Sequence, residues 1–472
     1  MNDILRKYNR GIWLFCGLIS LLVICCLAYK IILSADEREH LYCSYLVWRG
    51  EIPYRDFFEH HHPLLWYIFA PLLIFFHNTP WIWFIIRGFT IILLLITAYF
   101  VYKIARLIDD DKERALVSAV LYCSFYAVQY VAFSFRPDNL MLLLFVAGVY
   151  YFFCYVAYEK KRYLIGSYFL FLLSFLALQK ILFMLIVMGG IVFFLPRLHK
   201  NLGLELKMLL LPILGFALFL GYWYYHGVLK DYFELNFILN MKIKIVAYER
   251  SPLVWGGNLL GLWFSYLLFK KANYYLKAVI ILFLGTLCSL ACYAHWLHYW
   301  FPIYPFLAII ITKGGERLFK NNYRWFWILL WFFENVFVMV NLYNYKLVNL
   351  SSFSQSTATV LNLTDEDDLI IGSDIWVGGL RKSALGYYWG VWTISQLDYK
   401  LFHRREWPDI NLIIKTRHPR IVANYVFMSC LSEKNEQVDD YAFCHEVWSI
   451  DRQVLSKYWT SDLVYWYPNK GE

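Results

Sequence analysis

Two adjacent carboxylates, Asp36 and Glu37, follow directly on the first long apolar run of the sequence. A carboxylate just past a membrane segment is placed to take the proton of an attacking hydroxyl group. Ser34 precedes the pair, and acids in the first turn of a helix also cap its free backbone N–H groups. We therefore expect both acids to belong to a catalytic site, one as the base and the other as a capping acid, and the residues alone leave open which acid has which function.

The loop GEIPYRDFFEHHHP gathers a second set of polar groups between two apolar runs. Imidazoles and carboxylates bind divalent ions, but three consecutive histidines rarely all face one ion. The loop is therefore expected chiefly to line a polar cavity, and a divalent cation is left open as the one candidate cofactor, with no metal ligand assigned. The substrate-binding residues predicted in this loop are Arg55, Glu59, His61 and His62.

The segment SFRPDN places Arg136 and Asp138 between two apolar runs. One interpretation is structural, because Pro137 ends a helix and Asp138 or Asn139 can cap the next one. The other is that Arg136 binds a phosphate oxygen or orients an acid. Both Arg136 and Asp138 are predicted to belong to the substrate site.

Three more sets of residues are candidates for contact with an anionic donor. Lys180 stands in a short turn, where a lysine either snorkels or contacts a phosphate. The loop of residues 226–252 is basic and amphipathic, which is typical of a segment on the membrane surface and also of an ordinary solvated loop. His298 and Tyr299 stand at the start of a later apolar run. They belong either to an interfacial belt of aromatic residues or to the substrate site. The predicted residues are Lys180, Lys242, Lys244, Arg250, His298 and Tyr299.

The elements that must position these residues are membrane helices. Of 472 residues, 60% are hydrophobic and 17% are charged, against roughly 25% charged in a soluble domain. The first run is too long for the core of a signal peptide and precedes no cleavage site, so it is predicted to be a retained span. The apolar runs lie at 11–33, 63–76, 81–102, 115–134, 140–158, 163–178, 181–195, 208–225, 253–269, 278–294, 299–312 and 325–345.

The orientation follows from the basic clusters between these runs. The run of residues 63–76 is short and holds two prolines, so we treat it as interfacial or re-entrant. Every second connection between the spans then contains a cluster of Lys and Arg residues, and these connections lie on the cytoplasmic side, as the positive-inside rule requires. This predicts about eleven spans in a plasma (inner) membrane, with the N-terminus cytoplasmic and the tail extracytoplasmic. Nearly all the unusual polar residues then lie on the outer face, and the net charge of +9 is an orientation signal rather than a sign of nucleic-acid binding.

The chain is predicted to consist of a membrane domain, residues 1–345, and a small extracytoplasmic α/β domain, residues 346–472. In the tail, DDLIIGSDIWVGG is predicted as a strand, DINLIIKTRHPRIVANYVF as a helix, a proline turn and a strand, and IDRQVLSKYW as a helix. The tail has no GxGxxG, P-loop or HExxH motif. Cys430 and Cys444 can pair if the tail is outside the cytoplasm.

Several motifs in their order along the chain resemble one superfamily. These are the acid pair after the first span, G-x-x-P-Y-R-D-F-F-E-H-H-H-P-L, R-P-D between later spans, and H-Y-W-F-P-I-Y-P. Together they resemble the polytopic glycosyltransferases of the GT-C fold. The resemblance is to the bacterial branch related to protein O-mannosyltransferases and the lipid A aminoarabinose transferase.

The resemblance implies an all-α polytopic enzyme that moves a hexosyl or pentosyl group, with inversion, from a polyprenyl monophosphate to a hydroxyl of a glycan, lipid or protein. It implies that Asp36 is the base and that basic residues such as Arg136 and Lys180 hold the phosphate. The family's loop ends in a K-P-P-L-like sequence, whereas this chain has H-H-H-P-L. The family's lysine is therefore absent, and His61 or His62 is the candidate to replace it.

Two other classes of membrane protein are alternatives. A transporter or flippase would have charges in the middle of its spans and repeat symmetry, whereas here Arg87 and Glu334 are the main mid-span charges and no repeat is visible. An O-antigen polymerase or ligase would favour a long, arginine-rich outer loop late in the chain, whereas the principal polar loop of this chain comes early.

Overall fold

The computed structural model describes residues 2–31, 33–194, 202–243, 251–290, 296–319, 322–344, 350–371, 380–389, 393–423, 459–460 and 464–466. The chain forms two compact units. Unit 1 comprises Met1–Ile31, Arg87–Tyr222 and Lys244–Val348, and unit 2 comprises Ile32–Ile86, Trp223–Ile243 and Asn349–Glu472.

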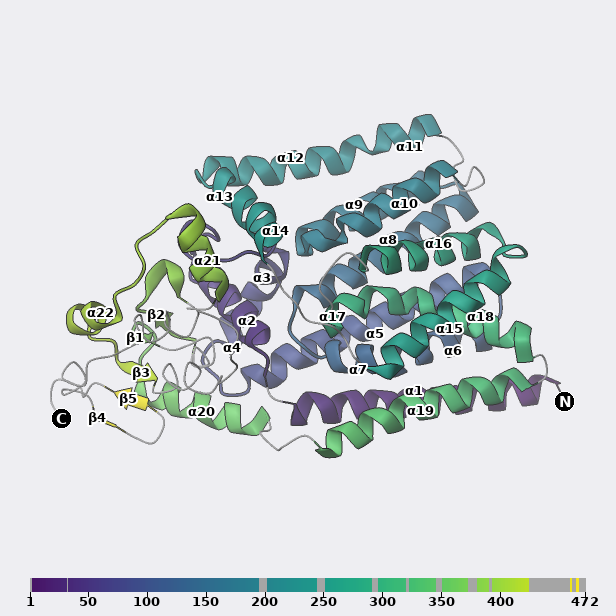
Figure 1. Ribbon diagram of the computed structural model, residues 1–472, viewed down its shortest axis with the longest axis horizontal. Helices are drawn as coiled ribbons and strands as arrows, with labels where there is room; N and C mark the ends of the chain where they lie inside the picture. The colour runs from purple at the N-terminus through teal and green to yellow at the C-terminus, as the bar shows by residue number, and fades with distance from the viewer. Residues whose placement is uncertain are drawn as a thin grey trace. The chain divides into compact units, whose positions relative to one another are not determined.

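Unit 1 is built from helices, most of which coincide with the predicted apolar runs (Figure 1). Some helices cross a unit boundary by a few residues. The elements are α1 (Asn2–Lys30), α5 (Ile82–Ile108), α6 (Lys112–Ser124), α7 (Tyr126–Val131), α8 (Pro137–Tyr158), α9 (Lys161–Ala177), η2 (Gln179–Ile181), α10 (Leu182–Phe194), α11 (Leu202–Met208), α12 (Leu210–Tyr225), α15 (Pro252–Phe269), α16 (Tyr274–Leu290), α17 (Leu297–Trp300), η4 (Phe301–Ile303), α18 (Tyr304–Phe319) and α19 (Tyr323–Asn344).

The most extensive helix pair of unit 1 is α8 with α9. Gly148 allows their close approach, because a Cβ atom at this position would meet the ring of Phe171 at 2.6 Å. Two serines of α9 donate hydrogen bonds across the pair, Ser167 to the carbonyl of Gly148 at 2.9 Å and Ser174 to that of Met141 at 2.7 Å. The pair is held by small residues and serine hydroxyls, as is common between membrane helices.

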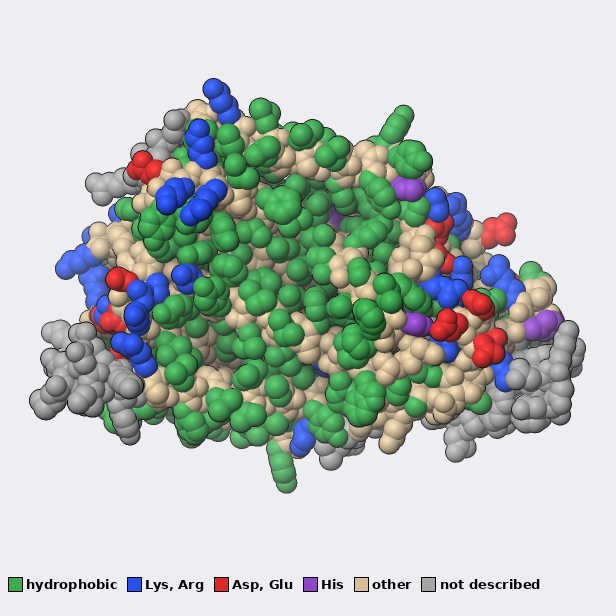
Figure 2. Space-filling model, turned by 180° about the vertical axis from the view of Figure 1, so that it is seen from behind, with side chains coloured by type: hydrophobic (Ala, Val, Ile, Leu, Met, Phe, Trp, Pro, Cys, Tyr) green, Lys and Arg blue, Asp and Glu red, His purple; other side chains and the backbone are tan. Residues whose placement is uncertain are grey.

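Unit 1 exposes an apolar surface that suits lipid. Six described helices are long and apolar enough to cross a membrane: Arg10–Lys30, Ile82–Ile108, Pro137–Tyr158, Gly203–Tyr225, Pro252–Phe269 and Tyr323–Tyr343. Their outer surfaces carry exposed large apolar side chains, and green side chains cover much of the face in Figure 2. The chain is therefore a polytopic membrane protein, and eleven as the number of spans stays a prediction.

Unit 2 combines short helices with a small sheet. Its helical elements are α2 (Ala35–Trp48), α3 (Leu64–Phe69), η1 (Ala70–Leu72), α4 (Leu73–Phe76), α13 (Leu229–Phe233), the π-helix η3 (Glu234–Leu239), α14 (Asn240–Lys242), α20 (Leu350–Leu363), η7 (Gly386–Tyr388), α21 (Thr393–Phe402) and α22 (Ile410–Arg417). The predicted short run at 63–76 is thus a helix interrupted at Pro71 by one 3₁₀ turn.

The sheet of unit 2 has the strand order β2–β1–β3–β5–β4. Its strands are β1 (Leu369–Ile371), β2 (Lys382–Ser383), β3 (Ile421–Ala423), β4 (Trp459–Thr460) and β5 (Val464–Trp466). β1 pairs in parallel with β2 and β3, whereas β5 is antiparallel to β3 and β4. Val360 and Leu363 of α20 pack on Ile370 and Ile421 to form its core.

The predicted elements of the tail agree with the described ones in part. The predicted strand in DDLIIGSDIWVGG coincides with β1, and the predicted helix, turn and strand coincide with α22 and β3. The last predicted helix lies outside the described residues except for Trp459, which is in β4, and Cys430 and Cys444 also lie outside them. Unit 2 joins the tail to two earlier segments, so a separate domain at residues 346–472 stays a prediction.

Two segments that carry predicted site residues are fixed by packing within unit 2. Every residue of α2 from Glu37 to Leu46 is buried. The cause is packing within unit 2, where Tyr42 contacts the ring of Trp389 at 4.5 Å. The described part of loop 226–252 is helical, and the buried side chains Tyr232, Leu235, Asn236 and Leu239 fix it in unit 2.

Candidate functional site

The acid pair lies at the start of α2, where one acid caps the helix. The Ser34 hydroxyl accepts a hydrogen bond from the Glu37 N–H at 3.2 Å, and the Ser34 N–H donates to the Glu37 carboxylate at 3.0 Å. This capping box assigns to Glu37 the capping function that the sequence left open between the two acids. Asp36 is half-buried in the same turn, and its function as the base stays a prediction.

The end of α2 turns the chain back along the helix. Gly50 follows the last turn with φ of +85°, a backbone conformation that favours glycine, and its N–H bonds to the carbonyl of Val47 at 3.0 Å. The loop then returns beside α2, so that the Cys43 thiol donates to the carboxylate of Glu59 at 3.2 Å. Glu39 precedes Cys43 by four residues and therefore lies on the same face of the helix.

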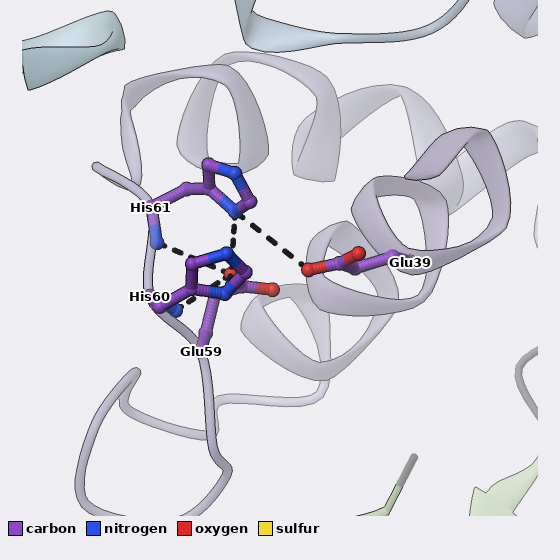
Figure 3. A group of neighbouring side chains, drawn as sticks. All are labelled: Glu39, Glu59, His60 and His61. Carbon is purple, nitrogen blue, oxygen red and sulfur yellow. Dashed lines mark hydrogen bonds and ion pairs between the residues drawn. The ribbon is translucent and has the colours of Figure 1, made fainter. Parts of the chain in front are cut away.

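Four side chains meet at this point, and we call Glu39, Glu59, His60 and His61 the acid–histidine cluster (Figure 3). One oxygen of Glu59 binds His61 Nδ1 at 2.7 Å, the backbone N–H of His60 at 2.7 Å and that of His61 at 3.1 Å. His61 Nδ1 also lies 3.6 Å from Oε1 of Glu39. The described ligand atoms lie within 4.8 Å of one another.

Burial and mutual charge separate the pKa values of the four groups. Burial raises the pKa of Glu39 to about 8, and the charge of Glu59 adds to this effect. Burial also opposes ionisation of Glu59, but His61 and His60 hold the pKa of Glu59 well below its usual range. Burial lowers the pKa of His60 to about 4. Burial would lower the pKa of His61 too, but Glu59 and Glu39 raise it to about 10. At neutral pH the cluster therefore contains one anion, Glu59, and one cation, His61.

The raised pKa values predict that stability falls as the solution becomes alkaline. The contribution of Glu39 is complete below its unfolded pKa near 4.5 and is lost as the pH rises through about 8, and that of His61 is lost between about 6.5 and 10. We expect the thermal unfolding temperature, measured in detergent with a chelator present, to fall by about 3 °C or more between pH 6 and pH 8.

The variant Glu39→Gln should flatten this fall, because a glutamine does not titrate. Glu159 offers a matched control, since it is an exposed acid of unit 1, and Glu159→Gln should keep the wild-type slope. Equal slopes in the wild type and in Glu39→Gln would contradict the assignment of the raised pKa to Glu39.

Two residues predicted for the loop site lie apart from the cluster. Arg55 forms a two-fold ion pair with its neighbour Asp56, at 2.9 and 2.8 Å, and 42% of its side chain is exposed. His62 is buried and shares a hydrogen bond of 3.0 Å with the hydroxyl of Tyr232. Of the four residues predicted in this loop, the structure brings together Glu59 and His61.

A second group forms in unit 1, and we call Arg136, Asp138, Lys180, His298 and Tyr299 the Asp138 cluster. Asp138 is 1% exposed, binds the ammonium of Lys180 and accepts a hydrogen bond from Arg136 Nε at 3.3 Å. The Lys180 ammonium lies 4.9 Å from the ring centre of Tyr299, and the His298 ring lies 4.6 Å from the same ring. Five residues predicted from three separate motifs thus lie in one place. Their two cations and one carboxylate leave an excess positive charge, which suits an anionic ligand.

The structural interpretation of SFRPDN is wrong in one respect. Pro137 is the first residue of α8, as a helix start favours, but no side chain caps this helix. Asp138 points its carboxylate to Lys180 instead, and the side-chain amide of Asn139 donates backwards to the carbonyl of Ser134 at 2.8 Å. The ion pair with Lys180 outweighs a cap because it compensates a buried charge.

The remaining predicted residues come from the basic loop. Lys242 ends α14 and is exposed. Lys244 and Arg250 lie outside the described residues. Within the described part of this segment, no basic residue joins either cluster.

The sequence interpretation missed Glu39 and His60 as members of a site. Glu39 is not among the predicted site residues, yet helical spacing places it three residues after Asp36 and four before Cys43. This row of ionisable groups on one face of the helix was the sequence feature that could have identified Glu39 as a site residue. His60 could not be separated from its two histidine neighbours, because loop geometry decides which of them faces Glu59.

Comparison with known proteins agrees with this architecture. A family model described as dolichyl-phosphate-mannose-protein mannosyltransferase matches residues 60–225. No curated protein matches the chain. The structure is similar to that of ArnT from Cupriavidus metallidurans, solved with undecaprenyl phosphate, at 12% identity and a TM-score of 0.58, covering 89% of this chain and 94% of that one.

A second similar structure is the oligosaccharyltransferase of Archaeoglobus fulgidus, solved with a tethered acceptor peptide. It has 10% identity and a TM-score of 0.54, with 98% of this chain and 74% of that chain covered. At these identities the likeness establishes the fold. The resemblance predicted from the sequence is thereby confirmed: this chain has the fold of the GT-C glycosyltransferases, and its residues 60–225 match the dolichyl-phosphate-mannose-protein mannosyltransferase family.

Proposed function

We propose that the protein is an integral-membrane, inverting glycosyltransferase that moves a sugar from a polyprenyl monophosphate to a hydroxyl acceptor on the extracytoplasmic face. The observation that carries this proposal is the family match over residues 60–225. That segment contains His60 and His61 of the acid–histidine cluster and Arg136, Asp138 and Lys180 of the Asp138 cluster.

The solved structures support a lipid-phosphate donor. The Cupriavidus transferase binds undecaprenyl phosphate, and the archaeal enzyme was captured with an acceptor peptide. By analogy, a lipid monophosphate is the donor of this chain and a hydroxyl-bearing glycan, lipid or protein is its acceptor. A lipid donor is available only in the membrane, which fits the apolar surface of unit 1.

The proposed reaction is a single displacement at the anomeric carbon. The acceptor oxygen forms a bond to this carbon while the bond from the carbon to the phosphate oxygen breaks. Asp36 takes the proton of the attacking hydroxyl, and the polyprenyl phosphate leaves with the electron pair of the broken bond. Cationic groups that meet the developing phosphate charge lower the barrier, and Lys180 and Arg136 are our candidates for this function.

The acid–histidine cluster is suited to hold a divalent cation. Its two carboxylates and two imidazoles are ligands that Zn²⁺ and Mn²⁺ accept. Among the described residues, the buried Oε1 of Glu39 accepts no hydrogen bond, so a cation there would compensate an oxygen that burial leaves poorly satisfied. A cation bound by Glu39, Glu59, His60 and His61 would supply positive charge and would fix the loop on α2.

Cation binding has a test that does not depend on activity. We expect the purified wild type to bind about one equivalent of Zn²⁺ or Mn²⁺ in equilibrium dialysis, and His60→Gln to bind at least about 10-fold more weakly. His77→Gln is the matched control, because His77 pairs with Glu366 away from the cluster. Equal affinity of all three proteins would contradict the proposed cation site.

The proposed activity is tested by incubating purified protein with a panel of polyprenyl-phosphate sugars and candidate acceptors. Release of polyprenyl phosphate together with a glycosylated acceptor is the expected result. Failure of every donor across hexosyl and pentosyl carriers, in protein that remains folded, would contradict the proposal. Labelling of residues 159–162 from the outside would contradict the proposed orientation.

A further inference from the structure

The tail binds the backbone of the residue that precedes Glu59. The Phe58 N–H donates to the carbonyl of Tyr387 at 2.9 Å, and the Phe58 carbonyl accepts a hydrogen bond from the Trp389 indole at 3.1 Å. Phe58 and Trp389 are each 1% exposed. Both backbone polar groups of Phe58 are therefore fixed by the tail, in a buried place where an unmade hydrogen bond is costly.

The same tail residues also fix the helix that carries Glu39. The Tyr42 hydroxyl accepts a hydrogen bond from the Ser383 N–H at 2.7 Å, and the Tyr42 ring packs on Trp389 with centres 4.5 Å apart. Tyr42 lies one helical turn after Glu39 on α2. Trp389 consequently touches both elements that supply the cluster, namely α2 and the loop ending at His61.

A third set of contacts reaches the histidines from α13 and η3. Arg404 is 7% exposed in its side chain, binds Asp231 and pairs with Glu234 at 2.6 Å. In the segment that Arg404 holds in place, the side-chain amide of Asn240 donates a hydrogen bond to the carbonyl of His60 at 2.9 Å. The tail thus supports the histidine loop through α13, η3 and α14 as well as directly.

We propose that the described residues 380–389 and 393–404 of the tail are a positioning element for the acid–histidine cluster and that Trp389 is its principal positioning residue. This element sets the distance between the carboxylates of Glu39 and Glu59 by holding their backbones, because these two residues come from different elements. The inference rests on the proposed function only for what the cluster binds.

Trp389→Phe is the decisive variant, because it removes the indole donor while keeping an aromatic ring on Tyr42. Outer contacts of this kind commonly change metal affinity by about 10- to 100-fold. We expect Trp389→Phe to weaken Zn²⁺ or Mn²⁺ binding by this factor in dialysis and to lower the unfolding temperature, because the buried carbonyl of Phe58 loses its donor.

Trp407→Phe is the matched control. Trp407 packs on Tyr388 and Tyr399 in the same part of the tail, whereas the two backbone hydrogen bonds of Phe58 described above are made by Tyr387 and Trp389. We expect this variant to bind the cation like the wild type. Equal affinity of Trp389→Phe and Trp407→Phe would overturn the proposal.

Hydrogen exchange keeps the test independent of the cation site. We expect the amides of residues 57–62 to exchange at least about 10-fold faster in Trp389→Phe than in Trp407→Phe, after each rate is corrected for the measured global stability of that variant. If the wild type binds no cation but this difference is present, the cation proposal fails and the positioning element stands. Equal exchange in the two variants would overturn the positioning element.

Discussion

Replacing Asp36 by asparagine is expected to lower the turnover of sugar transfer by about 10²- to 10⁴-fold, the usual contribution of a general base. Asparagine has nearly the same shape as aspartate but cannot accept the proton of the acceptor hydroxyl. Asp36 lies half-buried in the first turn of α2, so a neutral side chain there should not unfold the helix. The measurement is single-turnover transfer from a polyprenyl-phosphate sugar, with the unfolding temperature recorded for the same preparation.

Glu37→Gln provides the comparison, because the two acids are adjacent and differ in their contacts. Glu37 closes the capping box with Ser34, and glutamine is accepted at that position of a capping box. A much smaller loss of turnover is expected than in Asp36→Asn. Full activity of Asp36→Asn, or a larger loss in Glu37→Gln, would reject Asp36 as the base.

The helices were predictable because their signal is local. Each described apolar run appears as a helix or as consecutive helical pieces, and Pro71 and Pro137 stand where a helix is interrupted or begins. The proline turn in the tail likewise predicted the end of α22 and the start of β3. Hydrophobic runs and proline positions fix such elements with little help from distant residues.

The burial of α2 was not predictable, because it depends on distant segments. Its sequence carries Glu37, Glu39 and His40 among apolar residues and is typical of a half-exposed helix, yet all three are buried. The burial arises because Trp389 and Ser383, more than 300 residues later, pack on Tyr42. A single sequence carries no direct signal for such a contact.

The two clusters differ in how far the sequence predicted them. For the Asp138 cluster, the predicted location of Arg136, Lys180 and Tyr299 on the same side of the membrane was enough to identify them as site residues. For the acid–histidine cluster, sidedness selected Glu59 and His61 but gave no reason to prefer Glu39. Glu39 contacts His61 because of the face of α2 that is turned toward the returning loop, and Gly50 sets the path of that loop.

Replacing Lys180 by methionine is expected to lower sugar transfer by about 10²- to 10³-fold, as the loss of one preorganised charge partner commonly does. The single change also removes one of the two cations that contact Asp138, a carboxylate that is 1% exposed. Loss of such a charged hydrogen bond costs roughly 1–3 kcal/mol of folding free energy. A drop in activity alone therefore does not separate a damaged fold from a lost phosphate contact.

The double variant Asp138→Asn/Lys180→Met separates the two effects. It removes both charges of the pair, so the unfolding temperature should return toward that of the wild type. If Lys180 also meets the phosphate of the donor, transfer stays low and the KM for the lipid donor stays high although stability has recovered. If activity recovers together with stability, Lys180 serves Asp138 only, and the phosphate assignment must pass to Arg136. Because stability and donor KM respond separately in this cycle, each result assigns Lys180 to one function.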